Sequence, residues 1–295
     1  MKRAKDLTRA ALRAFPLPRQ TDSGKDAHGR LLIVAGNRQV PGAAILCAMA
    51  ALRSGAGQVR VATVASVAPG IALQIPEVLV VPLAESRDGD CARGSVREVQ
   101  QQAEGIDAIV AGPGVREGSV TAMIGKMLLA SGQPMALDAG MLHDLPKLAA
   151  HCRDASTPPV LLPHSGELAA LLELDEDEVE ADRLAAAHNA AEHYGAFVLA
   201  KGADSHIAAP DGRAWTFRGG APGLGVAGSG DTLAGIVGAL LARGADPLTA
   251  LLWAVLLHGE AGEALSRKVG SVGFLAREIP GEIPALLDRQ ASARA

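Results

Sequence analysis

Residues 221–232 read APGLGVAGSGDT, a glycine-rich loop that leads directly into an apolar segment with helical spacing. The apolar residues of that segment recur at helical intervals before a stop at Gly244, and they are Leu233, Ile236, Val237, Leu240 and Leu241. A glycine loop before a helix leaves backbone N–H groups unpaired at the positive end of the helix dipole, where phosphate is the usual occupant. Gly228, Ser229 and Gly230 are therefore predicted to form an anion hole.

Asp231 is an unusual neighbour for an anion hole, because its carboxylate would repel a bound phosphate. A carboxylate is useful there if it takes a proton from a substrate hydroxyl. Glycine loop, anion hole and base together predict phosphoryl transfer to an alcohol, with Asp231 as the catalytic base. The alternative is a tight turn in which Asp231 only caps the helix. Neither G-x-x-x-x-G-K-[ST] nor a G-x-G-x-x-G after the first predicted strand occurs in the sequence.

The composition argues against several classes of function. Charged residues make up 20% and aromatic residues 2%, with a net charge of −4, so no nucleic-acid partner is expected. Cys47, Cys91 and Cys152 form no C-x-x-C pair, which disfavours structural zinc and disulfides and favours a cytoplasmic location. The longest apolar run, residues 250–257, is too short to cross a membrane. Residues 1–20 are basic without an apolar core, so we expect a leader segment and not a secretory signal.

Apolar runs of strand length alternate with segments of helical pattern along the chain. The predicted strands are 31–35, 59–64, 78–81, 108–111, 135–138, 160–162 and 197–200. The predicted helices are 42–54, 95–103, 119–129, 167–172, 182–194, 230–243 and 247–264, followed by a weaker C-terminal segment. This alternation predicts an α/β fold of three layers, α/β/α, with a mostly parallel central sheet and helices on both faces.

Two further segments complete the predicted architecture. Residues 205–209 and 214–217 are joined through Pro210-Asp211-Gly212 and predict a hairpin on the sheet. Residues 173–180 are acidic and predict a solvated loop that leads into the next helix. We see no linker or internal repeat, so residues 21–295 are expected to form a single domain.

Distinctive residues follow the predicted strands at the edge where open α/β sheets bind ligands. These segments are 36–43, Gly112-Pro113-Gly114, Asp138, Pro163-His164-Ser165-Gly166-Glu167 and Lys201-Gly202-Ala203-Asp204-Ser205. His164 could cap a helix or donate a hydrogen bond to substrate, and Lys201 could reach solvent or neutralise a diphosphate. Asp138 could cap a turn or orient Mg²⁺. Five such loops at one edge, beside the anion hole, predict a ligand site there.

The same segments resemble the ADP/ATP-dependent NAD(P)H-hydrate dehydratases of the ribokinase-like superfamily, in order, over about residues 25–285. The matching motifs are His28-Gly29-Arg30, Pro41-Gly42-Ala43, residues 51–57 (ALRSGAG), Pro76-Glu77-Val78, Gly112-Pro113-Gly114, residues 163–167 (PHSGE), Lys201-Gly202-Ala203, Gly228–Asp231 and His258-Gly259 with Ala261-Gly262. The glycine-aspartate motif is shared by many sugar and vitamin kinases. PHSGE and the RSGAG helix end are more specific to the dehydratases.

The resemblance implies a ribokinase-like fold and a repair reaction. Hydrated NADH or NADPH is phosphorylated on its ring hydroxyl with ADP (or ATP) and Mg²⁺, and elimination of phosphate regenerates the dihydronicotinamide. By position, the residues implied to contact the hydrate are Ala43, Gly114, His164 and Asp231, with Asp231 as the base. Those implied to contact the adenine nucleotide are Lys201, Gly202, Ala203, Asp204, Ser205 and Gly230. ADP is expected to be the better donor.

Some positions depart from the family pattern. Val40 stands where an aromatic residue is frequent, and Gly140 replaces the second aspartate of an Asp-Ala-Asp motif. Arg116 replaces a glycine in the loop that begins at Gly112. Ala221 and Ala227 replace an asparagine and a glycine before the anion hole. These changes bear on substrate choice more than on fold.

Two other functions stay open on the sequence. One is a small-molecule kinase that stops at the phosphorylated alcohol, and the other is a nucleotide-binding regulatory protein without turnover. Retention of Asp231 argues against the second. For the dehydratase, the resemblance implies a homo-oligomer (a tetramer) and a separate NAD(P)H-hydrate epimerase in the same pathway, with no membrane partner.

Overall fold

A computed structural model describes residues 4–18 and 28–292, and within them one sheet has ten strands in the order β1-β10-β9-β8-β7-β6-β5-β2-β3-β4. The strands are β1 (Lys5–Asp6), β2 (Arg30–Val34), β3 (Gln58–Val64), β4 (Leu79–Leu83), β5 (Ala108–Ala111), β6 (Met135–Leu137), β7 (Val160–Leu161), β8 (Phe197–Ala200), β9 (Ser205–Ala208) and β10 (Ala214–Phe217). β9 runs antiparallel to both of its neighbours, and the other pairs are parallel. The predicted mostly parallel sheet and its hairpin are confirmed.

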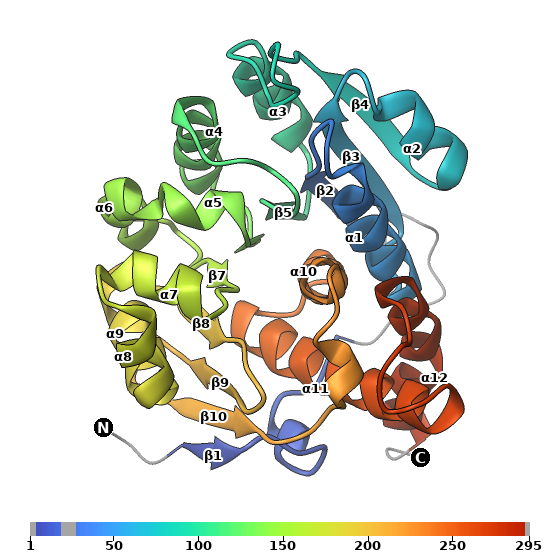
Figure 1. Cartoon of the computed structure of the whole chain (residues 1–295), viewed down its shortest axis with the longest axis vertical. Helices are drawn as coiled ribbons and strands as arrows, with labels where there is room; N and C mark the ends of the chain where they lie inside the picture. The colour runs from blue at the N-terminus through green and yellow to red at the C-terminus, as the bar shows by residue number, and fades with distance from the viewer. Residues whose placement is uncertain (1–3, 19–27, 293–295) are drawn as a thin grey trace.

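Two hydrophobic clusters lie on opposite faces of this sheet, so helices cover both faces (Figure 1). Leu31 and Ile33 of β2 belong to one cluster and Leu32 and Val34 to the other, because successive strand residues point to opposite faces. Helices of the first face are α1 (Pro41–Arg53), α2 (Ala68–Gln74), α10 (Ser229–Ala242), α11 (Pro247–Lys268) and α12 (Ile279–Ser292). Those of the second are α3 (Ser95–Ala103), α4 (Ser119–Leu129), α5 (Gly140–His143), α6 (Ala149–Arg153), α7 (Ser165–Leu172), α8 (Glu176–Ala181) and α9 (Arg183–Tyr194). The predicted three-layer α/β/α fold is confirmed.

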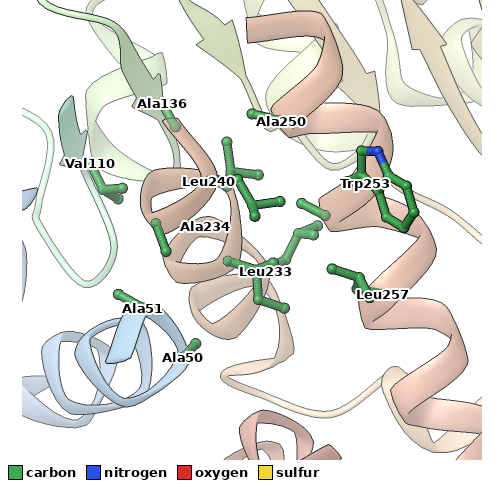
Figure 2. Packing of buried hydrophobic residues seen from close by; sticks show 14 of the residues in the cluster. Ala50, Ala51, Val110, Ala136, Leu233, Ala234, Leu240, Ala250, Trp253 and Leu257 are labelled. Atoms are coloured by element: carbon green, nitrogen blue, oxygen red, sulfur yellow. The ribbon is translucent and has the colours of Figure 1, made fainter. Parts of the chain in front are cut away.

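Helix α10 lies in the middle of the first face, between α1 and α11 (Figure 2). Its glycines allow this close packing. A Cβ atom at Gly235 would lie 2.2 Å from Cys47 O of α1, and one at Gly238 would lie 2.2 Å from Val110 Cγ2 of β5. The residues of the predicted anion hole therefore begin a helix that contacts the sheet and both neighbouring helices.

The basic segment at the N-terminus adds an edge strand to the sheet. β1 pairs with β10, and Leu7, Leu12 and Leu17 are buried. The Trp253 indole N–H of α11 donates to Phe15 O at 2.7 Å. Residues 4–18 are thus packed onto the body next to α11.

Several helices differ from what the sequence pattern predicts. The acidic stretch predicted as a loop contains α8, because Val179 is fully buried and anchors a helical turn there. Helix α2 was not predicted, since its seven residues include Pro69 and Gly70 and carry a weak helical pattern. Helix α11 is longer than predicted, and by length and composition it could cross a membrane. Because 78% of its most apolar window is buried inside the protein, it is a core helix.

Candidate active site

The residues predicted to form an anion hole, Gly228, Ser229 and Gly230, lie at the N-terminus of α10. Gly228 adopts φ +90°, which turns the loop into the helix and suits glycine. Ser229 N donates to Val226 O and Thr232 N to Gly228 O. Gly230 and Asp231 lie between these two residues, and their backbone N–H groups have no acceptor within residues 4–18 and 28–292. Two adjacent backbone donors at the positive end of a buried helix are available to an anion.

Asp231 lies in the first turn of α10, and its carboxyl is more basic than a carboxyl in water. Removal from water raises the pKa of Asp231 to about 6, and the nearby Asp138 carboxylate acts in the same direction. The Lys201 ammonium opposes both effects. A carboxylate with this pKa is ionised at neutral pH and is a better proton acceptor than an ordinary aspartate.

Lys201, just after β8, lies among three acidic side chains, those of Asp138, Glu167 and Asp231. Its Nζ atom lies 2.9 Å from Asp138 Oδ1 and 4.0 Å from Glu167 Oε2. Burial of the ammonium works to lower its pKa, but Asp138, Glu167 and Asp231 together raise the pKa of Lys201 above its usual value. Asp138 and Glu167 are 4% and 8% exposed as side chains, so the interaction is shielded from water. The sequence brought Asp138, Lys201 and Asp231 into consideration separately, and the structure places them in one charged cluster.

A cavity of about 810 Å³ opens beside this cluster. Of the residues predicted for nucleotide or anion binding, the lining includes Lys201, Gly202, Ala203, Ser205, Ser229 and Gly230. Phe217, Leu224 and Val255 give it apolar walls. Asp204 is not part of the lining, and its carboxylate lies 3.4 Å from Arg218 Nε. The cavity therefore combines an apolar compartment with a cation and a helix N-terminus.

His164 is the N-cap of α7. Its Nδ1 atom accepts from Gly166 N at 3.1 Å and Glu167 N at 3.3 Å, while Glu167 Oε2 accepts from His164 N at 2.9 Å. This reciprocal arrangement is a capping box, so His164 caps a helix, which was one of the two roles considered for it from the sequence. The ring also lines the cavity next to Lys201. One imidazole thus fixes Glu167 and reaches the ligand space.

Ala43, in the first turn of α1, and Gly114, in the loop after β5, meet at a second location. A Cβ atom at Gly114, whose φ is +64°, would lie 2.7 Å from Ala43 Cβ and 2.9 Å from Val40 O. A Cβ atom at Gly112 would lie 1.7 Å from Asp138 O, so this loop is packed against the strand end that carries Asp138. Ala43 and Gly114 therefore lie on the other side of Asp138 from Lys201, whereas His164, also a predicted hydrate contact, lies on the lysine side.

The departures from the family pattern fall in two places. Arg116 donates to Gln39 Oε1 at 2.8 Å and lies 3.5 Å from Asp90 Oδ2, so its charge is held at the loop surface. A Cβ atom at Gly140 would lie 2.1 Å from Val115 O, so a side chain there would displace the loop that carries Arg116. Ala221 lines the cavity, and Ala227 lies in the loop before α10.

Glu167 and His258 are polar residues of this site to which the sequence assigned no role. His258, on α11, has its Nε2 atom 3.1 Å from Ser229 Oγ and lines the cavity. It follows an apolar run, and nothing in its spacing links it to Ser229. Glu167 appeared in the sequence analysis only as part of a motif. Its proximity to Lys201 could not be foreseen, because it depends on the pairing of β7 with β8.

The described residues contain no group of three or more His, Cys, Asp or Glu side chains arranged to hold a metal ion alone. Asp138 and Glu167 nevertheless offer carboxylate oxygens beside the anion hole. Magnesium is commonly held by one or two carboxylates together with substrate phosphates. The donor set therefore fits an ion that arrives with a nucleotide, and it does not fit a metal cage made by the protein.

Comparison with known proteins finds relatives that share one family description. A family model described as NAD(P)H-hydrate dehydratase matches residues 31–285. The ADP-dependent (S)-NAD(P)H-hydrate dehydratase of Xanthomonas campestris pv. campestris is 48% identical over 288 residues, which is 97% of each chain. The bifunctional NAD(P)H-hydrate repair enzyme Nnr of Thermofilum pendens is 32% identical over 92% of this chain. The chain spans 52% of that bifunctional protein.

Solved structures show the same fold. The ADP/ATP-dependent NAD(P)H-hydrate dehydratase of Bacillus subtilis, co-crystallised with ATP/Mg²⁺, gives a TM-score of 0.83 at 27% identity, over 97% of this chain and 99% of that one. A ribokinase-like superfamily protein of Enterococcus faecalis gives 0.82 at 26% identity, over 97% and 96% of the two chains. The ribokinase-like fold implied by the sequence motifs is confirmed.

Proposed function

The chain belongs to the NAD(P)H-hydrate dehydratase family, and we propose that the carboxylate and anion hole at the start of α10 regenerate NADH or NADPH from its hydrate. The enzyme is a hydro-lyase that uses ADP as phosphoryl donor, and the closely similar Xanthomonas protein is described as ADP-dependent. The observation that carries the site assignment is the position of Asp231. Its carboxyl, with a raised pKa, stands next to two backbone N–H groups that have no protein acceptor in the described part of the chain.

Asp231 supplies the base for the first step. It takes the proton of the hydrate's ring hydroxyl while that oxygen forms a bond to the terminal phosphorus of ADP, and the bond from this phosphorus to the bridging oxygen breaks to release AMP. The Gly230 and Asp231 N–H groups stabilise the charge that develops on the transferred group. In the second step the ring carbon–oxygen bond breaks, phosphate leaves with the electron pair, and loss of a ring proton restores the dihydronicotinamide.

Lys201 and Asp138 set the charge around this reaction. The ammonium offers a positive charge to the phosphates at the cavity wall. Its ion pair with Asp138 keeps the lysine in place before a nucleotide enters. Asp138 and Glu167 would hold Mg²⁺ brought by the nucleotide, and that ion would neutralise charge on the phosphates.

The two ligands are assigned to the two sides of Asp138. The nucleotide takes the cavity, with Lys201, Gly202, Ala203, Ser205 and Gly230 in contact and its base against the apolar walls. The hydrate takes the side of Ala43 and Gly114 and meets Asp231 at its ring hydroxyl. His164 lines the nucleotide cavity, so this proposed hydrate contact lies on the nucleotide side of Asp138. Asp204 is proposed to act at the cavity rim through the loop it shares with Ser205.

The test is incubation of the purified protein with hydrated NADH and ADP, with absorbance of the dihydronicotinamide and release of phosphate followed together. Equal amounts of both products are expected. Accumulation of a phosphorylated hydrate would favour the small-molecule kinase, and nucleotide binding without turnover would favour the regulatory protein. Substituting ATP for ADP and comparing kcat/KM measures donor preference.

We further propose a cytoplasmic homotetramer that works with a separate NAD(P)H-hydrate epimerase. The relative's reaction is specific for the (S) hydrate, so the other epimer must be converted before it can be repaired. Light scattering of the purified protein tests the tetramer. Supplying a mixture of both epimers tests the epimerase, because only about half of the mixture should react until an epimerase is added.

A further inference from the structure

His258 is the residue through which α11 touches the anion hole, and the reaction described above does not use it. It follows the apolar run 250–257 on the core helix, and its ring is partly exposed to the cavity. Among the described residues, the ring has hydrogen-bond contacts with two atoms of Ser229, the first residue of α10, and with no other residue.

One ring nitrogen serves both contacts. His258 Nε2 lies 3.1 Å from Ser229 Oγ and 3.1 Å from Ser229 O. The carbonyl is an acceptor only, and it also accepts from Thr232 Oγ1 at 2.7 Å. An Nε2 atom without a proton would present a lone pair to this carbonyl, which is unfavourable. The contact with Ser229 O therefore selects the imidazole tautomer that carries its proton on Nε2.

The ring is neutral when it makes these contacts. Removal of water from the imidazole is the largest cause, and together with the Lys201 ammonium it lowers the pKa of His258 to about 4, although the bond to Ser229 O acts in the opposite direction. A neutral imidazole has a single N–H, and the carbonyl contact places it on Nε2.

The tautomer determines the direction of the Ser229 hydroxyl. With a proton on Nε2, the ring donates toward both Ser229 atoms, and Ser229 Oγ receives it as an acceptor. The hydroxyl proton must then point elsewhere, and Ser229 lines the cavity beside Gly230. In the opposite tautomer the hydroxyl would donate its proton to the ring nitrogen. That proton would then be unavailable for a hydrogen bond to an incoming anion.

We propose that His258 is a positioning residue that turns the Ser229 hydroxyl proton into the anion hole, where it donates to the phosphoryl group alongside the Gly230 and Asp231 N–H groups. This inference rests on the proposed phosphoryl transfer. The Ser229 hydroxyl strengthens the anion hole only while its proton is not donated to the His258 ring. The chemistry at α10 therefore depends on a residue of α11 that does not touch the substrate's reacting atoms.

Three variants test the proposal in the full-length protein. Ser229→Ala removes the hydroxyl, and His258→Leu removes the ring donor while keeping an apolar side chain in an apolar helix. Each should lower kcat roughly 10²-fold, the lower end for loss of one donor to a developing negative charge, with a much smaller change in KM for ADP. His258→Gln keeps an N–H donor at similar reach and should recover most of the activity. Thermal unfolding of each variant reports whether it is folded.

The double variant separates positioning from general support of the fold. If His258 acts through the Ser229 hydroxyl, His258→Leu should add little further loss of kcat in the Ser229→Ala background. Losses that multiply to roughly 10⁴-fold would overturn the proposal, as would a His258→Gln variant no more active than His258→Leu.

The tautomer can be measured without any turnover. The ¹⁵N spectrum of the imidazoles at neutral pH should show His258 protonated at Nε2, and assignment of the proton to Nδ1 would overturn the inference. This measurement does not depend on the proposed function. An inactive wild-type protein with the expected tautomer would contradict the dehydratase reaction and leave the hydrogen-bond arrangement standing.

Discussion

Lys201 Nζ lies 2.9 Å from Asp138 Oδ1, in an ion pair that also affects the neighbouring Asp231. Asp138 raises the pKa of Asp231, and Lys201 lowers it. The pair therefore sets the basicity of the proposed catalytic carboxylate from two opposite directions. Each member can be altered separately, which makes the electrostatics of the site testable.

Asp231→Asn should lower kcat by roughly 10²- to 10⁴-fold, because asparagine keeps the size of the side chain but accepts no proton. ADP affinity should hold or improve, since a negative charge near the phosphates is removed. Steady-state kinetics and calorimetric titration with ADP check both. Near-normal turnover in the folded variant would show that Asp231 is not the base and is only an acidic residue in the first turn of α10.

The same variant should be more stable than the wild type at pH 8. The folded-state pKa of Asp231 is raised to about 6, so its favourable contribution is present at low pH and is lost as the pH rises through that value. The gain in the free energy of unfolding at pH 8 should be at most about 3 kcal/mol and should vanish below about pH 4. Urea unfolding at both pH values measures it, and a gain that is equal at both would contradict the raised pKa.

Lys201→Met should move the pH dependence of turnover to higher pH. In the wild type kcat/KM should rise through about pH 6 as the base loses its proton, and removal of the ammonium removes the one influence that lowers this pKa. Asp138→Asn should shift the midpoint in the opposite direction. The comparison uses midpoints and not absolute rates, because both substitutions will also reduce activity. Identical midpoints in all three proteins would exclude electrostatic tuning by this pair.

His164→Ala and His164→Asn separate capping from substrate contact. Alanine cannot cap α7 and should cost about 1 kcal/mol of stability, whereas asparagine is a strong N-cap and should restore it. If His164 also contacts the hydrate, KM for the hydrate should rise in both variants with little change for ADP. Recovery of KM by asparagine would show that the cap alone matters.

Gly140→Ala should raise KM for the hydrate more than KM for ADP. The added Cβ atom would lie 2.1 Å from Val115 O, so the loop that places Gly114 against Ala43 must move. The nucleotide cavity does not include this loop in its lining. A KM increase confined to ADP would show that the two ligands are assigned to the wrong sides.

Gly235→Ala should destabilise the protein by about 1–3 kcal/mol, because its Cβ atom would lie 2.2 Å from the backbone oxygen of Cys47. Gly70→Ala is the matched control in α2, where a Cβ atom meets nothing within 4 Å. That substitution should be neutral or stabilising, since alanine favours a helix by up to about 1 kcal/mol over glycine. Equal effects at both positions would show that close packing of α1 and α10 is not what requires Gly235.

Much of the architecture was predictable because the strands are buried on both faces. Residues 108–111 and 197–200 are continuous apolar runs, and the structure has strands with the same bounds. The acidic helix α8 was missed because a single buried residue, Val179, holds it to the body. Such an anchor acts through tertiary packing and leaves no periodic pattern.

The site was predictable where chemistry lies at strand or helix ends, and less so where it depends on neighbours in space. Asp231 was predicted as a site residue from the glycine loop before it, and Lys201 from its place directly after a predicted strand. The ion pair of Lys201 with Asp138 depends on the order of β6, β7 and β8 in the sheet, which sequence patterns do not specify. The contact of His258 with Ser229 depends on how α11 crosses α10, for which the spacing of residues gave no signal.

The docking of residues 4–18 has a consequence for the order in which the chain can fold during its synthesis. β1 has its partner in β10, and Arg9 pairs with Glu260, 251 positions further along. At roughly 5–20 residues per second, the ribosome makes Arg9 about 10–50 seconds before Glu260 exists. The N-terminal segment therefore has no partner until β10 and α11 have been made. Addition of β1 to the sheet is therefore a late step in folding, which can follow only after β10 has been made.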